Sequence, residues 1–165
     1  MFDFYDGGGL DATCVGMAQV DVEGNVNVSK LGPVAIGCGG FINITQNTKK
    51  VIFCGEFRAK GAKVAITDDG LCVEQEGAMA KFVEKVDQIT FSGKQAAKTG
   101  NKVLYVTERC VFQLTPDGLV LTEIAPGIDL ERDILAQMAF RPKIAEDLKP
   151  MDIRIFQDRP MGISD

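Results

Sequence analysis

A run of three glycines in four positions, Gly-Cys-Gly-Gly at 37–40, is the part of the sequence most suited to chemistry. Apolar residues lead into it at 34–36, and residues 41–44 follow without a charge. Glycines let a substrate carbonyl approach the backbone closely, and a helix starting after them would aim free N–H groups at developing negative charge. A purely structural turn that uses the conformational freedom of glycine is the alternative interpretation.

The run matches neither of the common nucleotide-binding loops. The dinucleotide fingerprint needs G-x-G-x-x-G after a strand, with an acidic residue about 20 positions further on. The phosphate loop needs Gly-Lys followed by Ser or Thr, and no such sequence follows the glycines. The pattern therefore favours a site for a carbonyl oxygen over a site for phosphate.

The chain contains no histidine, which excludes Ser-His-Asp and Cys-His nucleophiles and most transition-metal sites. Carboxylates, backbone amides, lysines or cysteines must carry any chemistry. Five cysteines, at 14, 38, 54, 72 and 110, have spacings that fit neither a zinc site nor a disulfide framework. We expect them to be small core residues, except Cys38, whose place in the glycine run leaves a reactive thiol as an alternative.

Lys60 and two glutamates are further candidates. Lys60 lies just past an expected strand at 51–57, and open α/β sheets bind ligands at the carboxyl ends of their strands. A solvated lysine is the simpler account. Glu74 and Glu76 would share one face of a strand, although surface carboxylates explain them as well.

Size and charge restrict the classes of function. With 165 residues, 45% of them hydrophobic, the chain suits one domain with a real core. A net charge of −5 argues against nucleic acid and against an anionic membrane surface as partner. We find no apolar run near the roughly 20 residues of a membrane span and no signal-peptide pattern, so a reducing cytoplasm is the expected compartment.

The order of the expected strands and helices predicts an α/β domain that positions these residues. Its open mixed sheet is flanked by helices, and the second half of the chain is β-rich. Alternation and turn signals predict its strands and hairpins. Expected strands cover 14–21, 26–31, 51–54 (buried on both faces) and 103–106, and hairpins join 63–67 to 71–73 and 110–114 to 119–124.

The remaining segments are less regular. A helix is expected to open within 40–47, and Asp129 is expected to cap another with Leu130, Ile134 and Met138 on its apolar face. Residues 1–9 are interpreted as a terminal strand docked in the sheet, or as the start of a chain that begins in the middle of a larger domain. Residues 94–100 are interpreted as a loop. Three prolines in 141–165 indicate a terminal arm that docks on a neighbour.

Seven short segments resemble those of one enzyme family. In chain order they are Gly8-Gly9-Leu10-Asp11, Val15-Gly16-Met17-Ala18-Gln19-Val20-Asp21, Gly24-Asn25-Val26-Asn27, Gly37-Cys38-Gly39-Gly40, Ala59-Lys60-Gly61, Thr107-Glu108-Arg109-Cys110-Val111-Phe112 and Leu121-Thr122-Glu123-Ile124-Ala125-Pro126-Gly127-Ile128. With this order and spacing, the chain resembles the C-terminal, β-type half of family I CoA-transferases. It is most similar to the acetate/propionate branch, which is related to succinyl-CoA:3-ketoacid CoA-transferase.

The resemblance implies ping-pong transfer of CoA from an acyl-CoA to a short-chain carboxylate, through a mixed anhydride and a glutamyl-CoA thioester. Coenzyme A is then a substrate, with no metal and no permanently bound cofactor. The resemblance also assigns site residues. The backbone of Gly39 and Gly40 forms an oxyanion hole, and Gly40, Phe41, Ile44 and Lys60 contact CoA.

One family motif is missing. The nucleophilic glutamate of the family lies in an E-x-G motif, upstream of the matching stretch, and this chain contains no E-x-G. We therefore expect residues 1–165 to be a single, N-terminally truncated β-type domain, inactive alone, completed by an N-terminal or α-type half and forming a homo-oligomer. The alternative is a non-catalytic CoA-binding or oligomerisation module.

Overall fold

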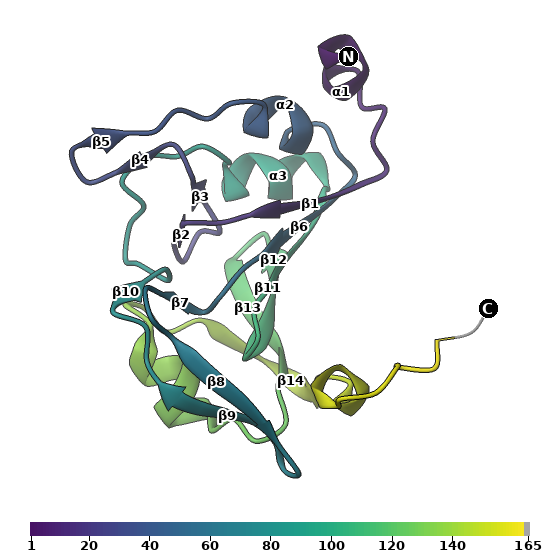
Figure 1. Ribbon diagram of the computed structural model, residues 1–165. Coiled ribbons are helices and arrows are strands. Elements are labelled where there is room, and N and C mark those ends of the chain that lie inside the picture. The colour runs from purple at the N-terminus through teal and green to yellow at the C-terminus, as the bar shows by residue number, and fades with distance from the viewer. Residues whose placement is uncertain (164–165) are drawn as a thin grey trace.

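A central mixed sheet organises the protein in the computed structural model, which describes residues 1–163 (Figure 1). Its six strands lie in the order β1-β6-β11-β12-β13-β14, with β1, β6 and β11 parallel and β12–β13 an antiparallel hairpin. The strands are β1 (Ala12–Gly16), β6 (Lys50–Cys54), β11 (Lys102–Val106), β12 (Cys110–Thr115), β13 (Gly118–Ile124) and β14 (Lys143–Pro150). The expected α/β class with an open mixed sheet is confirmed.

Short elements surround this sheet. The two-stranded pairs are β2 (Gln19–Val20) with β3 (Val26–Asn27), β4 (Lys30–Leu31) with β5 (Val34–Ala35), β7 (Arg58–Ala59) with β10 (Met79–Ala80), and β8 (Lys63–Thr67) with β9 (Gly70–Gln75). The helices are α1 (Phe2–Asp6), α2 (Phe41–Thr45), α3 (Gly93–Thr99), the π-helix η1 (Leu130–Ile134), and the 3-10 helices η2 (Leu135–Gln137) and η3 (Ile153–Phe156). None of the helices within residues 1–163 has the length and apolar character to cross a membrane.

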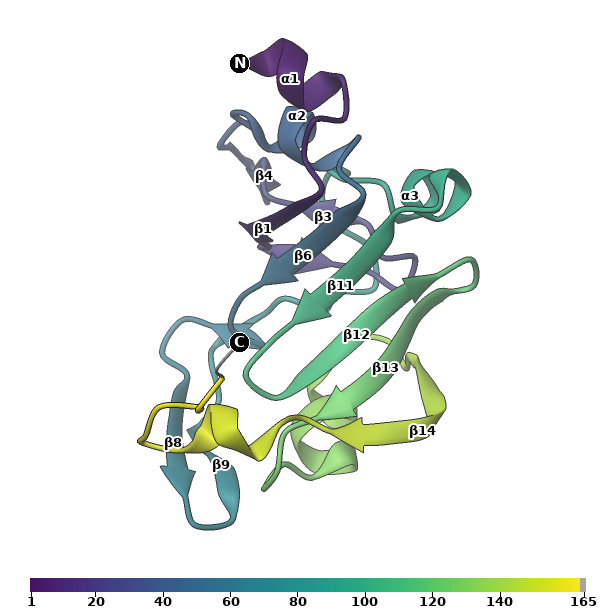
Figure 2. The same cartoon turned by 90° about the vertical axis from the view of Figure 1, so that its right-hand side faces the viewer.

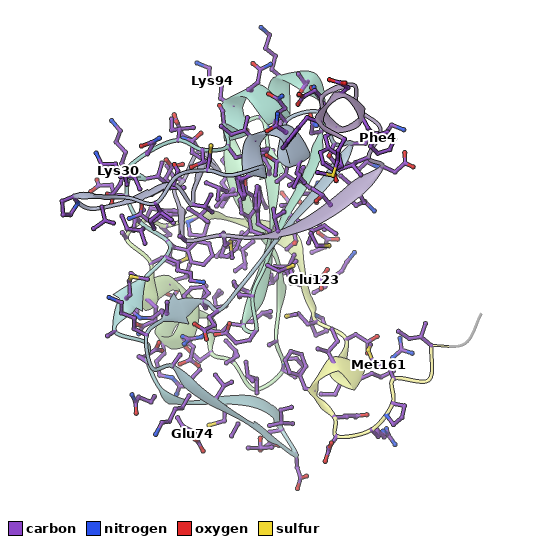
Figure 3. All side chains as sticks on the ribbon, turned by 45° about the horizontal axis from the view of Figure 1, so that its top comes forward. Phe4, Lys30, Glu74, Lys94, Glu123 and Met161 are labelled. Atoms are coloured by element: carbon purple, nitrogen blue, oxygen red, sulfur yellow. The ribbon has the colours of Figure 1, made fainter. Side chains whose placement is uncertain are left out.

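The ends of the molecule differ in character. Both ribbon views place α1 and α2 at one end and the β8–β9 hairpin at the other (Figure 1, Figure 2). Figure 3 shows Phe4 and Lys94 at the first end and Glu74 on the hairpin at the second. The glycine run, which connects β5 to α2, therefore lies toward the α1–α2 end.

The core follows from alternation along the central strands. Val51 and Phe53 of β6 and Val103 and Tyr105 of β11 are buried on one face, where they join the main hydrophobic cluster. Leu104 and Val106 point to the other face and pack on a smaller cluster. Because Cys54 is exposed, the prediction that residues 51–54 are buried on both faces is wrong at the end of that strand.

Local turn and helix signals were reliable. The hairpins around Asp68-Asp69-Gly70 and around residues 115–118 are both present, as is the strand at 103–106. The helix expected within 40–47 is α2. Asp129 caps η1 as expected, with its Oδ1 accepting from the amide of Arg132 at 2.7 Å, but the helix is π and then 3-10 in character.

Three expectations need correction. Residues 1–9 contain the helix α1, whose Phe2 and Phe4 are exposed, so they are no docked strand. Residues 14–21 divide into the edge strand β1 and the separate β2. Residues 94–100 are helical because the Ser92 side chain accepts from the amide of Gln95 and Gly100 ends α3 in a left-handed conformation.

The C-terminal segment 141–165 contains a strand of this chain's own sheet. Lys143–Pro150 forms β14, which pairs in parallel with β13 across a bulge. The 3-10 helix η3 follows, and its Phe156 is buried against the smaller cluster. Docking of the rest of this arm on a neighbour stays a prediction.

A buried arginine links the sheet to the surrounding loops. Arg109, between β11 and β12, donates from Nη1 and Nη2 to the two oxygens of Glu76, each at 2.8 Å, and from Nε to Glu108 at 3.1 Å. Its Nη1 also donates to the carbonyl of Asp133 at 2.8 Å, and its guanidinium lies 4.9 Å from the centre of the Phe57 ring. One side chain thereby joins the segments after β6, β9 and β11 to η1.

We predict that Arg109→Met lowers the free energy of unfolding by about 3–5 kcal/mol, because Glu76 and Glu108 lose the cation that compensates them. Urea denaturation measures the change. The control is Arg141→Met, whose ion pair with Glu131 is exposed on both sides and whose removal should leave the midpoint unchanged. Equal midpoints for the two variants would contradict the assigned role of Arg109.

Candidate functional site

The backbone of the glycine run has an open face. Gly37 and Gly39 have φ of +88° and +53°, a region that L side chains rarely adopt. A Cβ built on either residue meets no atom of the described chain within 4 Å. Conformation rather than crowding therefore requires glycine here, and the space beside the run is free for a ligand.

Three consecutive amides of the run remain available as donors. The amide of Gly37 donates to the carbonyl of Ser29 at 3.0 Å, and that of Phe41 to the carbonyl of Cys38 at 3.0 Å. Within residues 1–163, no oxygen accepts a hydrogen bond from the amides of Cys38, Gly39 or Gly40. Adjacent free N–H groups beside open space can stabilise negative charge on an oxygen.

Ser29 holds the start of the run in place. Its carbonyl accepts from the amides of Ile36 at 2.8 Å and Gly37 at 3.0 Å. The residue is itself buried, and its hydroxyl lies 2.7 Å from that of Thr90. The run is thus fixed to a buried polar contact before the free amides begin.

Phe41 anchors the end of the run. Its ring stacks on Phe53 of β6, with the centroids 5.9 Å apart, and the carbonyl of Gly40 accepts from the amide of Ile44 at 3.0 Å. Phe53 lies near the carboxyl end of its strand, which is where open α/β sheets bind ligands. Phe41 and Ile44, both predicted to contact CoA, are half-buried, so part of each remains open to a ligand.

Lys60 has an unusual backbone. Its φ of +64° makes it the one non-glycine residue within 1–163 with a positive φ, and Gly61 follows at +83°. The carbonyl of Lys60 accepts from the amide of Ala78 at 3.0 Å, which ties this turn to β10. The side chain is exposed. Such strain in a non-glycine residue often marks a functional position.

A hollow of about 320 Å³ lies at the carboxyl ends of β6 and β11. It is lined by Gly55, Glu56, Ala62, Val64, Val106, Thr107 and Glu108. The Lys60-Gly61 turn leads directly into its wall at Ala62. The structure thus brings Lys60 to the expected strand edge, but no contact in the described part of the chain joins it to the glycine run.

The two glutamates differ from one another. Glu74 is exposed on β9, as a surface carboxylate should be (Figure 3). Glu76 instead binds Arg109 and also lies 3.7 Å from Nε of Arg58, so the surface interpretation is wrong for it. Sequence reasoning missed this pairing. The available signal was Arg109 itself, an arginine between two apolar strands.

The cysteines are mostly not core residues. Cys110 alone is buried among the five, Cys38 is half-buried, and Cys14, Cys54 and Cys72 are exposed. Burial raises the pKa of the Cys110 thiol, an effect only partly offset by its contact with Thr107. The expectation of buried thiols is therefore confirmed for Cys110 and wrong for three of the others.

Comparison with known proteins adds to this geometry. No family model matches the chain. Caffeate CoA-transferase of Acetobacterium woodii is 52% identical over 168 residues, which cover 99% of this chain and 32% of the relative. The acetate CoA-transferase subunit beta of Haemophilus influenzae is 31% identical over 92% of this chain and 58% of that subunit.

A solved structure gives the same result. The acyl-CoA transferase YdiF of Escherichia coli O157:H7, in a thioester complex with CoA, superposes with a TM-score of 0.96 and is 50% identical, over 99% of this chain and 32% of that one. The chain belongs to the family I CoA-transferases. It spans about a third of the length of the first curated relatives it matches.

Lys60→Gly should raise the thermal unfolding midpoint, because glycine adopts φ of +64° without the roughly 1 kcal/mol cost of a Cβ. Lys60→Ala is the matched control, since it removes the charge and keeps the Cβ. If both variants melt alike, the backbone at this position is not strained.

The thiols give a second test. With a maleimide at neutral pH, Cys14 and Cys72 should react first, Cys54 and Cys38 more slowly, and Cys110 only after unfolding. Access controls the rate, and partial burial raises the pKa of the Cys54 thiol, which lowers its thiolate fraction. Mass spectrometry of the labelled peptides gives the order. Cys38 labelling faster than the exposed thiols would instead indicate an activated thiol in the glycine run.

Proposed function

We propose that this chain is the C-terminal, β-type portion of an acyl-CoA:carboxylate CoA-transferase and that its glycine run supplies the oxyanion hole. The three unengaged amides of residues 38–40, beside an open backbone face, are the observation that carries this proposal. The activities for which the relatives are named, caffeate and acetate CoA-transferase, agree with the reaction type.

The reaction needs an oxyanion hole at each acyl transfer. A glutamate from outside this chain attacks the thioester carbonyl, and the carbon–sulfur bond breaks to give a mixed anhydride and CoA thiolate. The thiolate then attacks the glutamyl carbonyl, which releases the first carboxylate and leaves a glutamyl-CoA thioester. The acceptor carboxylate reverses these steps. Each tetrahedral stage places negative charge on an oxygen that the amide of Gly40 can stabilise.

The other site residues bind CoA in this proposal. The half-buried Phe41 and Ile44 form an apolar wall beside the run. Lys60, exposed at the strand edge, offers its cation to the anionic coenzyme. Gly39 keeps the approach to the amide of Gly40 open, because its missing side chain would otherwise project into the free space.

The nucleophile must come from another part of the enzyme, since no E-x-G occurs here. Exposed apolar side chains near the run, among them Phe2, Phe4 and Ile36, support docking of an N-terminal or α-type half. The edge strand β1 supports it too, since within residues 1–163 it pairs on one side only. We further propose a homo-oligomer in the cytoplasm that acts in short-chain fatty acid or ketoacid metabolism.

A chimera tests the function. The matching third of the E. coli YdiF protein is replaced by this chain, and CoA transfer from acetyl-CoA to butyrate is measured by chromatography. We expect transfer by the chimera and none by the 165-residue chain alone. Turnover by the isolated chain would show that it contains another nucleophile. A folded but inactive chimera that still binds CoA would favour the non-catalytic CoA-binding module.

Gly39→Ala in the chimera should lower kcat by about 10²–10³, the usual effect of losing an oxyanion-hole contact, because a methyl group then occupies the open face. Gly32→Ala is the matched control. Gly32 has φ of +57° and equally open space beside it. Its backbone amide donates a hydrogen bond to the Asp87 carboxylate, and alanine retains that donor. Both variants carry the same backbone strain, so equal kcat values for the two would refute the role of the run.

A further inference from the structure

Lys81 has a largely buried side chain whose ammonium has no partner in the described chain. It directly follows β10, is only 8% exposed, and its carbonyl accepts from the amide of Val20 at 2.8 Å. Within residues 1–163, its ammonium makes no hydrogen bond and no ion pair. Among the described residues no buried side-chain nitrogen lacks a partner, so the ammonium at the tip of this buried side chain reaches solvent and is accessible to an anion.

The ammonium lies at the carboxyl ends of two parallel strands. A Cβ built on Gly55, just after β6, would be 3.0 Å from Nζ of Lys81 and 3.8 Å from the carbonyl oxygen of Met17, just after β1. Any side chain at position 55 would therefore crowd the ammonium. Glycine keeps this place free at the edge where open α/β sheets bind ligands.

Lys81 and the glycine run share one face of the sheet. Side chains alternate along a strand, so a Cβ at Gly55 would point to the same face as Phe53, two residues earlier. Phe53 stacks on Phe41, which directly follows Gly40. The Phe41 ring and the ammonium of Lys81 thus lie on the same face of β6.

The nearby carboxylates are engaged elsewhere or face solvent. Glu76 and Glu108 both bind Arg109, and Glu108 also accepts from the amide of Phe57 at 2.8 Å. Glu56 is exposed beside the hollow at the strand ends. None of these acids forms an ion pair with Lys81 in the described chain.

We propose that Lys81 binds the carboxylate group of the acyl acceptor and holds it beside the glycine run, an inference that rests on the proposed function. A compact ammonium offers a point charge with three donors, which suits a small monocarboxylate. No bond is made or broken at Lys81. Its contribution is to concentrate an anionic substrate against the net charge of −5 on the chain.

The test compares three variants of the active chimera. Lys81→Met removes the charge with little change in volume, and Lys81→Arg retains it. Lys85→Met changes an exposed lysine four residues away and is the control. The KM for butyrate and the dissociation constant of CoA are measured for each variant. We expect Lys81→Met to raise the KM for butyrate 10- to 100-fold, which is about 1.4–2.7 kcal/mol, and to leave CoA binding unchanged.

The outcomes separate the two proposals. A parent chimera without transfer overturns the proposed function. With an active parent, a KM for butyrate equal in Lys81→Met and Lys85→Met overturns the role of Lys81 alone, since its tip then only reaches water. If thermal melting shows that Lys81→Met does not fold, Lys81→Gln gives the same readout. A KM in Lys81→Arg nearer to the parent than to the uncharged variant supports a charge contact.

Discussion

Enclosing the guanidinium of Arg109 is the constraint on which the carboxyl edge of the sheet depends. A buried arginine needs acceptors for its donors, and here two glutamates and one carbonyl accept four hydrogen bonds from it. Those acceptors come from segments after β9, β11 and within η1, so none of these loops can move independently. Glu108 also accepts from the amide of Phe57, which fixes the chain just after β6.

The glycine run is governed by a different constraint, which is the hydrogen bonding of backbone amides. Most backbone amides in a folded protein are paired, so three adjacent unpaired ones need a reason. The carbonyl of Ser29 accepts from the amides of Ile36 and Gly37, and the carbonyl of Cys38 accepts from the amide of Phe41. The amides of residues 38–40 therefore have no acceptor in the described chain. Gly39 is exposed and Cys38 and Gly40 are half-buried, so water can accept from these amides.

Much of the fold could be predicted because its signals are local. The Asp-Gly turns and the alternation at Val51 and Phe53 need no distant partner to be read. The helix α3 carried equally local signals in Ser92 and Gly100, but its polar sequence resembles a loop. The partners of Arg109 could not be predicted, since Glu76 and Asp133 lie 33 and 24 residues away along the chain. The glycines of the run were visible in sequence, whereas which amides stay free depends on Ser29.

The two largely buried side chains of Arg109 and Lys81 show how structure and function divide within one site. Arg109 offers five donors in a rigid plane, and the chain supplies acceptors for four of them, so its charge serves to hold loops together. Lys81 is placed by the same loops, yet no acceptor in the described chain reaches its ammonium. The side chain of Lys81 is largely buried but its ammonium reaches solvent, so water or a bound anion can accept from it. Because Glu76 and Glu108 bind Arg109, neither forms an ion pair with Lys81, and its ammonium stays available for the carboxylate that we propose it binds.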